Sequence, residues 1–443
     1  MATYRLFHGA VITPVSVHKA EFWPNALLHV NSSGIIEWIV SDVESSQIQS
    51  VALEKGLVVD DSVDVYELRH GEWLMPGFID THTASPDAGG QYELLDWLNN
   101  VTFPTESRFA DTKFAERVYS SVVDRVLNSG TTTCCYYGTL HLEATEILAK
   151  IVHNKGQRAF VGKCNMNRNS GSYQEDSTAQ SIERTRKLIS SIRALSPSSP
   201  LVHPVLTPRF AISCTTDLLH ALGDLAKQDP TLAIQTHISE NLSEIEFTRE
   251  LFPEASSYAD VYKRAGLLTD RTILAHAVGL GTDCSGGFSP SILTAVRDAG
   301  IASKVIGMTA VGSLPSPYAK LHLNGVKTAT TEPDKPKLAN KTLPLSALLH
   351  LSTLGGAQLC NLEHTVGSFE AGKEFDAVWV SVRPEAGNPG IWANLGEEGK
   401  EGKGEKMPAD SLEALLEKFF FCGDDRNVRK VWVRGRLVGG VDK

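Results

Sequence analysis

The sequence predicts an α/β protein, a parallel (β/α)8 barrel of the TIM type with a small β-sandwich formed by both termini. Between residues 76 and 365, short apolar runs alternate with segments of helical period. Before and after that region, strand-like runs alternate with turns instead. The chain has 443 residues and 42% hydrophobic content, which is enough for a barrel and one accessory domain.

The β-sandwich is predicted from residues 1–75 and 366–443. Runs rich in Val, Ile and Trp are separated by turn clusters such as Asn-Ser-Ser-Gly, which is typical of hairpins. We expect the two terminal segments to pair beside the barrel. The runs are RLFHGAVIT, NALLHVNSSGIIEWIV, VDVYELRHGEWLMP, GSFEAGKEFDAVWVSV and RKVWVRGRLVGG.

The barrel is predicted from residues 76–365. Amphipathic segments such as KFAERVYSSVVDRVLNSG and TDLLHALGDLAKQ separate its strands, and this repetition implies a parallel sheet. A doubly wound sheet is the alternative, but no GxGxxG phosphate loop opens the first unit. The strand candidates are GFIDTHT, TTTCCYYG, RAFVGKCN, VHPVLTPRF, LAIQTHIS, TILAHAV and GLGTD.

Charge and cysteine content favour small-molecule chemistry in the cytoplasm. The formal net charge of -10 argues against a nucleic-acid partner. The seven cysteines are scattered without CxxC spacing, as expected for reduced thiols. No secretory leader is recognisable and no apolar run is long enough to span a membrane. We therefore expect no membrane association.

Polar residues lie where predicted strands end, which is where a barrel builds its active site. His82 ends the first strand, His237 and Glu240 follow LAIQT, His276 follows TILA, and Asp283 ends GLGT. A single histidine at a strand end is more often a hydrogen-bonded structural residue than a metal ligand. Three histidines that converge with an aspartate, however, indicate a metal site. Imidazole and carboxylate ligands suit zinc or iron.

Longer motifs make the chain similar to a known family. It resembles the amidohydrolase superfamily and, within it, the guanine deaminases. PGFIDTH and GTD mark the superfamily, whereas THISEN, TPRF and LLDWL are specific to guanine deaminases. The other motifs shared along the chain are NSGTTTCCYYGT, GQRAFVGKCNMN, LSTLGGAQLCNLE, GSFEAGKEFDA and FCGDDRNV.

The resemblance implies an amidohydrolase-like barrel that hydrolyses guanine to xanthine and ammonia with one zinc ion per chain. The zinc ligands would be His82, His237 and Asp283. His276 would orient the attacking water, and Asp283 would take its proton. Glu240 would protonate a ring nitrogen of guanine. The family also leads us to expect a homodimer.

Substrate binding is likewise implied by the resemblance. Arg209 would donate to the guanine carbonyl and Phe210 would pack on the ring. His237, Glu240 and His276 would also contact the substrate. Without the TPRF motif, Arg209 and Phe210 would be interpreted as an ordinary pair at a strand end.

The first departure from the family lies in the first strand. The family ends this strand with His-x-His and places a substrate-binding glutamine soon afterwards. Here Ala84 stands where the second histidine is expected, and the next glutamine is Gln91. The first strand therefore supplies one ligand, His82, and we expect markedly weakened metal affinity. Asp87 is a candidate replacement.

The second departure lies between His276 and Asp283, which are seven residues apart. A parallel crossover needs at least about ten to twelve residues, so the seventh unit is missing and the barrel is incomplete. On one straight strand the two residues would be roughly 23 Å apart. Both could reach one metal only if the chain bends at Gly279 or Gly281.

These departures leave alternatives open. The chain is a working guanine deaminase, a catalytically impaired relative that binds a purine or forms oligomers, or an incomplete gene product. Hydrolysis of another aminated or chlorinated heterocycle is a further alternative within the superfamily. Arg209 followed by Phe210, together with THISEN, favours guanine.

Overall fold

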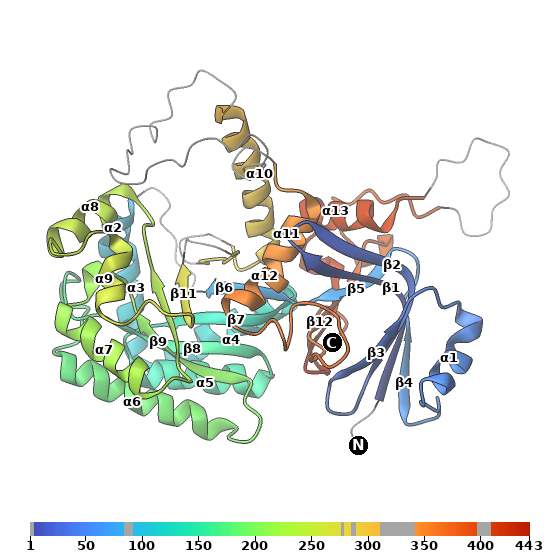
Figure 1. Ribbon diagram of the computed structural model, residues 1–443, viewed down its shortest axis with the longest axis horizontal. Helices are drawn as coiled ribbons and strands as arrows, with labels where there is room; N and C mark the ends of the chain where they lie inside the picture. The colour runs from blue at the N-terminus through green and yellow to red at the C-terminus, as the bar shows by residue number, and fades with distance from the viewer. Residues whose placement is uncertain (1–3, 84–91, 276–278, 285–288, 311–341, 397–408) are drawn as a thin grey trace.

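The structure is a computed structural model that describes residues 4–83, 92–275, 279–284, 289–310, 342–396 and 409–443. It has two parts, a parallel sheet wrapped by helices and a mixed sheet built from both ends of the chain (Figure 1). Within those ranges, no helix is long and apolar enough to cross a membrane.

Six parallel strands form the barrel sheet, in the order β11-β10-β9-β8-β7-β6. Neighbours in space are neighbours in sequence, as a singly wound barrel requires. Strands β7 and β8 are buried along their whole lengths, which explains their continuous apolar runs. The strands are β6 (Phe78–Thr83), β7 (Thr131–Gly138), β8 (Arg158–Asn165), β9 (Val202–Pro208), β10 (Ala233–His237) and β11 (Thr272–Ala275).

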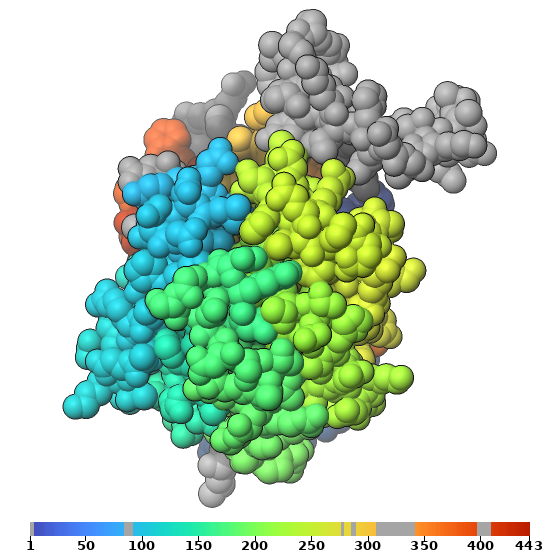
Figure 2. All heavy atoms as spheres, turned by 90° about the vertical axis from the view of Figure 1, so that its left-hand side faces the viewer, coloured from blue at the N-terminus to red at the C-terminus, as the bar shows by residue number. Residues whose placement is uncertain are grey.

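Helices connect these strands and cover the outside of the sheet (Figures 1 and 2). Side chains at the first residue before several helices accept a hydrogen bond from the first turn, including those of Asp111, Ser177 and Thr215. The connecting helices are α2 (Leu94–Trp97), α3 (Phe103–Ser107), α4 (Thr112–Asn128), α5 (Leu142–Lys155), α6 (Thr178–Leu195), α7 (Thr216–Gln228), α8 (Leu242–Leu251) and α9 (Tyr258–Arg264).

The barrel sheet is nearly closed, with β11 and β6 approaching each other. GLGTD, predicted as a strand, is instead an irregular segment beside β6. The Thr81 backbone N–H donates to the Leu280 carbonyl at 3.3 Å, and the Asp283 N–H donates to the His82 carbonyl at 2.9 Å. The segment therefore covers the exposed edge of β6. It is followed by α10 (Ile292–Ala310), α11 (Leu345–Ser352) and α12 (Leu354–Leu359).

The terminal strands form one connected mixed sheet of eight strands, where the sequence predicted a sandwich of two layers. Strand β1 pairs antiparallel with β2 and parallel with β4 and β5, and β3 joins the sheet through β2. The sheet contains β1 (Tyr4–Ser16), β2 (Lys19–Val30), β3 (Ile36–Val40), β4 (Val63–Glu67), β5 (Glu72–Pro76), β12 (Ala377–Ser381), β13 (Val428–Val433) and β14 (Arg436–Gly439); α1 (Ile48–Glu54) and α13 (Leu412–Cys422) accompany it.

A buried ion-pair cluster joins the two sheets. Arg158 at the start of β8 donates from Nε and Nη2 to the Asp376 carboxylate, at 2.9 and 3.0 Å. It also contacts Glu374 at 2.5 Å, and Arg434 pairs with Glu374 at 2.7 Å. Arg158 and Asp376 are almost fully buried, so both charges depend on each other for compensation.

We expect this cluster to make stability depend on pH. Burial raises the pKa of Glu374, but the Arg434 hydrogen bond and the Arg158 charge outweigh it and lower that pKa below 4.5. A lowered pKa stabilises the folded state above about pH 4.5, and this contribution is lost as the pH falls through the folded-state pKa. The variant Glu374→Gln should therefore be less stable than wild type at pH 7.

The difference should shrink as the pH falls below 4.5, measured by urea unfolding at pH 7 and pH 4. An equal difference at the two pH values would contradict a stabilising role for the Glu374 charge.

Candidate active site

The carboxyl ends of the barrel strands open into one pocket. Helix α2 contacts α8 above it, and Figure 2 shows residues of the blue segment beside the yellow-green helices on this side of the molecule. Residues from both sequence-predicted groups, metal ligands and substrate contacts, meet here. The lining residues are His82, Leu94, Trp97, Leu98, Glu106, Tyr137, Cys164, Arg209, Phe210, His237, Glu240 and Asp283.

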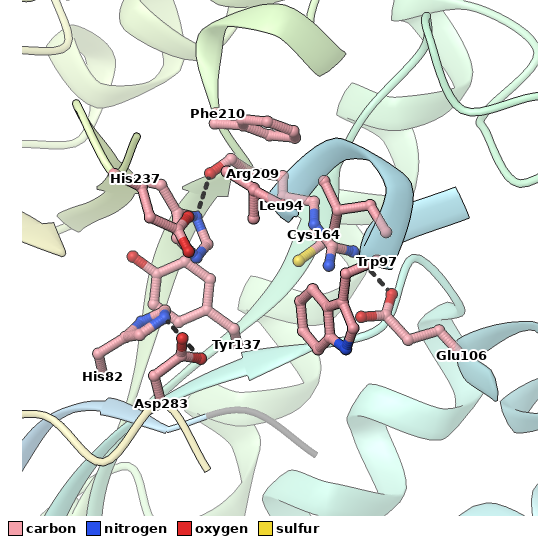
Figure 3. Close-up of a pocket in the computed structure, with 12 residues that line it drawn as sticks. His82, Leu94, Trp97, Glu106, Tyr137, Cys164, Arg209, Phe210, His237 and Asp283 are labelled. Atoms are coloured by element: carbon pink, nitrogen blue, oxygen red, sulfur yellow. Dashed lines mark hydrogen bonds and ion pairs between the residues drawn. The ribbon is translucent and has the colours of Figure 1, made fainter. Parts of the chain in front are cut away.

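His82, His237 and Asp283 lie on one side of the pocket (Figure 3). The rings of His82 and His237 are perpendicular, with centroids 4.6 Å apart. His82 Nε2 is 3.3 Å from Asp283 Oδ1. The chain bends at Gly279, whose φ is +125°, and Asp283 lies at the end of β6, where its N–H donates to the His82 carbonyl at 2.9 Å. His276 lies outside the described residues, so the expectation that a bend lets His276 and Asp283 share one metal stays a prediction.

The orientation of His237 is set by main-chain contacts. Its Nδ1 lies 2.6 Å from the Arg209 carbonyl oxygen, so Nδ1 carries the proton and donates. That tautomer leaves the lone pair on Nε2, which is how a metal-binding histidine is usually held. The Tyr262 hydroxyl donates to the His237 carbonyl at 2.7 Å and fixes the strand end.

Phe210 lies beside His237, with ring centroids 6.2 Å apart, and the Arg209 side chain extends to the opposite side of the pocket, where Trp97 lies (Figure 3). Arg209 and Phe210 are both buried, although they follow β9 in a short irregular segment. Arg209 Nη1 is 2.8 Å from Glu106 Oε2. The pocket thus presents the Arg209 cation with Trp97 on one side and two imidazoles with a carboxylate on the other.

Glu240 lines the pocket and has a raised pKa. Burial, followed by the negative charges of Asp283 and Glu244, raises the pKa of Glu240 to about 7. Its backbone N–H donates to Glu244 Oε2 at 2.7 Å, which fixes the loop after β10. A carboxyl group with a pKa near neutrality can both give and accept a proton under physiological conditions.

The predicted metal site is only partly visible. His276, Ala84 and Asp87 lie outside the described residues. Among the residues that the structure describes, no three His, Cys, Asp or Glu side chains are grouped as a ready metal site. The donors of His82, His237 and Asp283 nevertheless fit zinc in kind, since two imidazoles and a carboxylate are ligands that zinc accepts.

Comparison with known proteins identifies the family. Residues 73–438 match the amidohydrolase family. The chain is 35% identical to guanine deaminase from Dictyostelium discoideum, over 98% of each chain, and 35% identical to that from Mus musculus, over 98% of this chain and 96% of the relative.

The chain belongs to the guanine deaminases of the amidohydrolase family. Solved structures share the fold. Guanine deaminase from E. coli superposes with a TM-score of 0.78 at 23% identity, covering 99% of this chain and 100% of that one. Guanine deaminase from C. acetobutylicum with bound guanine superposes with a TM-score of 0.77 at 24% identity, covering 98% and 100%.

Internal segments of the family are absent from this chain. The alignment with the Dictyostelium relative runs over 488 positions, more than the 443 residues of the chain. The relative therefore has residues at positions where this chain has none. Such gaps are expected if the seventh barrel unit and part of the loop after β6 are missing.

We expect the bend at Gly279 to be sensitive to substitution. A Cβ atom there would lie 2.3 Å from Leu359 Cδ1, and the positive φ adds strain. Gly279→Ala should lower the free energy of unfolding by about 1–3 kcal/mol more than Gly56→Ala. Gly56 has φ +82°, closer to the left-handed region that other residues can adopt, and no atom within 4 Å of an added Cβ, so alanine there meets less strain and no clash. Equal costs in urea unfolding would contradict the prediction.

Several lining residues were missed from the sequence. Tyr137 packs edge-on against His82, with ring centroids 4.3 Å apart, and lies 4.9 Å from His237. It follows the pattern of an ordinary buried strand residue, so nothing in β7 singled it out. Trp97 belongs to the LLDWL motif and Glu106 follows it by eight residues, but no role was predicted for either. Only the folded chain places them against Arg209.

Proposed function

We propose that the protein is a guanine deaminase that hydrolyses guanine to xanthine and ammonia. Similarity to guanine deaminases over nearly the whole chain supports this proposal. The single observation that carries it is the pocket that unites Arg209 and Phe210 with His82, His237 and Asp283. Each of these residues was proposed for this reaction from its motif alone.

Recognition of guanine is assigned to Arg209 and Phe210. The Arg209 guanidinium would donate to the oxo group of the base, and Phe210 would pack on the planar ring. Trp97 supplies a second aromatic surface in the pocket (Figure 3). The amino-bearing carbon would then face His82, His237 and Asp283.

Proton movement is assigned to two carboxyl groups. Asp283 would accept the proton of the attacking water, because its carboxylate lies at the ligand side of the pocket. Glu240 would donate a proton to a ring nitrogen and help pass one to the departing ammonia, which suits a pKa of about 7. His276 would orient the water, a role that rests on the resemblance alone.

His82, His237 and Asp283 would hold one zinc ion. Zinc, when bound, lowers the pKa of a water molecule so that hydroxide is present at neutral pH. Because Ala84 replaces a ligand of the family, we expect zinc to be lost from the purified chain on dialysis and activity to return when zinc is added. One zinc per chain after prolonged dialysis against a chelator would contradict this prediction.

The test of the function is xanthine production. Purified protein with added zinc and guanine should release xanthine and ammonia in equal amounts. A second candidate, a catalytically impaired purine-binding relative, is favoured by the lack of three grouped ligands among the described residues. Purine binding without any xanthine would support that second candidate.

Cytoplasmic location and a homodimer complete the proposal. All seven cysteines are free, and six of them are buried, which suits a reducing compartment. The dimer rests on the family resemblance and is tested by light scattering of the purified chain.

A further inference from the structure

We propose that Glu106 is a positioning residue that holds the Arg209 guanidinium against the oxo group of the substrate and so sets the preference for 6-oxo purines. This inference rests on the proposed function, in which Arg209 binds that oxo group. Glu106 lies in α3, which follows α2 in the segment that closes the pocket, and it lines the same pocket as Arg209.

The pair between Glu106 and Arg209 is enclosed. Arg209 Nη1 and Glu106 Oε2 are 2.8 Å apart, and their side chains are only 9% and 13% exposed (Figure 3). A charge-assisted hydrogen bond at this distance is short and directional. Burial lowers the pKa of Arg209, but the charge and hydrogen bond of Glu106, together with the nearby Cys164 and Tyr173, raise it overall, so the guanidinium stays charged.

A second contact comes from the same helix. The Phe103 ring lies 5.3 Å from Arg209 Cζ, within range of a cation–π interaction. Helix α3 therefore holds the Arg209 guanidinium in two ways, through the charge of Glu106 and through the ring of Phe103, over which the guanidinium lies. A guanidinium carries five N–H donors in a planar fork. The pair with Glu106 uses Nη1. The N–H groups on Nε and Nη2 can then donate to a planar acceptor.

The backbone of Arg209 is fixed separately. Its N–H donates to the Asn165 carbonyl at 3.1 Å, and its own carbonyl accepts from His237. Neutralising Glu106 thus affects the Arg209 side chain while leaving these main-chain contacts in place. The expected consequence is a selective loss of ligands that need the guanidinium, with little change for ligands that do not.

Guanine and 2-aminopurine separate these two kinds of ligand. They share the ring system and the 2-amino group, but 2-aminopurine has no 6-oxo group. Because 2-aminopurine is fluorescent, its binding and its displacement by guanine are followed directly, on protein from which zinc has been removed so that guanine is not hydrolysed. For Glu106→Gln we expect the concentration of guanine needed for displacement to rise about 10- to 100-fold. The dissociation constant of 2-aminopurine should change less than about threefold.

Two further variants serve as controls. Glu106→Asp keeps the charge at a shorter reach and should recover part of the guanine affinity. Glu175→Gln neutralises another buried glutamate, which pairs with Lys163 at 2.6 Å and is not among the residues that line the pocket. It should cost stability while leaving the affinities for both purines unchanged.

Equal losses for guanine and 2-aminopurine in Glu106→Gln, or no loss for guanine, would overturn the proposal. Failure of wild-type protein to bind either purine would overturn both this proposal and the proposed function. Wild-type binding of guanine without xanthine production, together with a selective loss in Glu106→Gln, would overturn the deaminase function alone and support the role of Glu106.

Discussion

Glu240→Gln should lower kcat for guanine by about 10²- to 10⁴-fold, the range that general acid–base catalysis contributes. Glutamine has nearly the same shape as glutamate but cannot transfer a proton. The pKa of about 7 for Glu240 makes it the carboxyl group in the pocket best matched to proton transfer at neutral pH. Steady-state kinetics on zinc-loaded protein would measure the effect. Zinc content should stay at the wild-type level, because Glu240 is not among the proposed ligands.

Glu175→Gln is the matched control for this experiment. Glu175 is buried, pairs with Lys163 at 2.6 Å and is not among the residues that line the pocket. Its neutralisation should leave kcat within a few-fold of wild type. A Glu240→Gln variant that kept kcat within about tenfold of wild type would remove Glu240 from the proton path.

Arg158→Met should lower the free energy of unfolding by about 3–5 kcal/mol, the cost of leaving buried charges without their partner. Methionine replaces the packing of the arginine stem, so the loss reports mainly on Asp376 and Glu374. Asp376 is 3% exposed, so its carboxylate would be left buried without the guanidinium. Urea unfolding should show a lower midpoint with an unchanged slope.

The control is a pair on the surface. Lys155 and Asp124 are 2.6 Å apart, but the Asp124 side chain is 52% exposed. Lys155→Met should cost less than about 1 kcal/mol, because water already screens and solvates these charges. Similar losses for the two methionine variants would show that the junction between the sheets is not held by Arg158.

Strand positions in the barrel were predicted well from the sequence. TTTCCYYG and RAFVGKCN coincide with β7 and β8, because buried parallel strands are continuous apolar runs. The mixed sheet was harder to predict. Alternation along β1 indicates a half-buried strand but does not say which strands lie beside it, so the pattern fits one connected sheet as well as a sandwich.

The sequence predicted the site residues that lie at strand ends. It missed those whose position depends on tertiary contacts. His82 and His237 follow strands whose carboxyl ends must converge. Glu106 is 103 residues from Arg209 in sequence, and no local pattern pairs them. The sequence indicated only that a bend at Gly279 or Gly281 would be needed for His276 and Asp283 to reach one metal. It could not predict the bend itself, because glycine permits a positive φ without requiring it.

The central claim is that this pocket deaminates guanine although internal segments of the family are missing. Guanine turnover by the full chain, measured while zinc is titrated into metal-free protein, tests it most directly. We predict equal amounts of xanthine and ammonia, a rate that rises with added zinc, and loss of that rate in Asp283→Asn. Absence of xanthine at every zinc concentration, from folded protein, would contradict the claim.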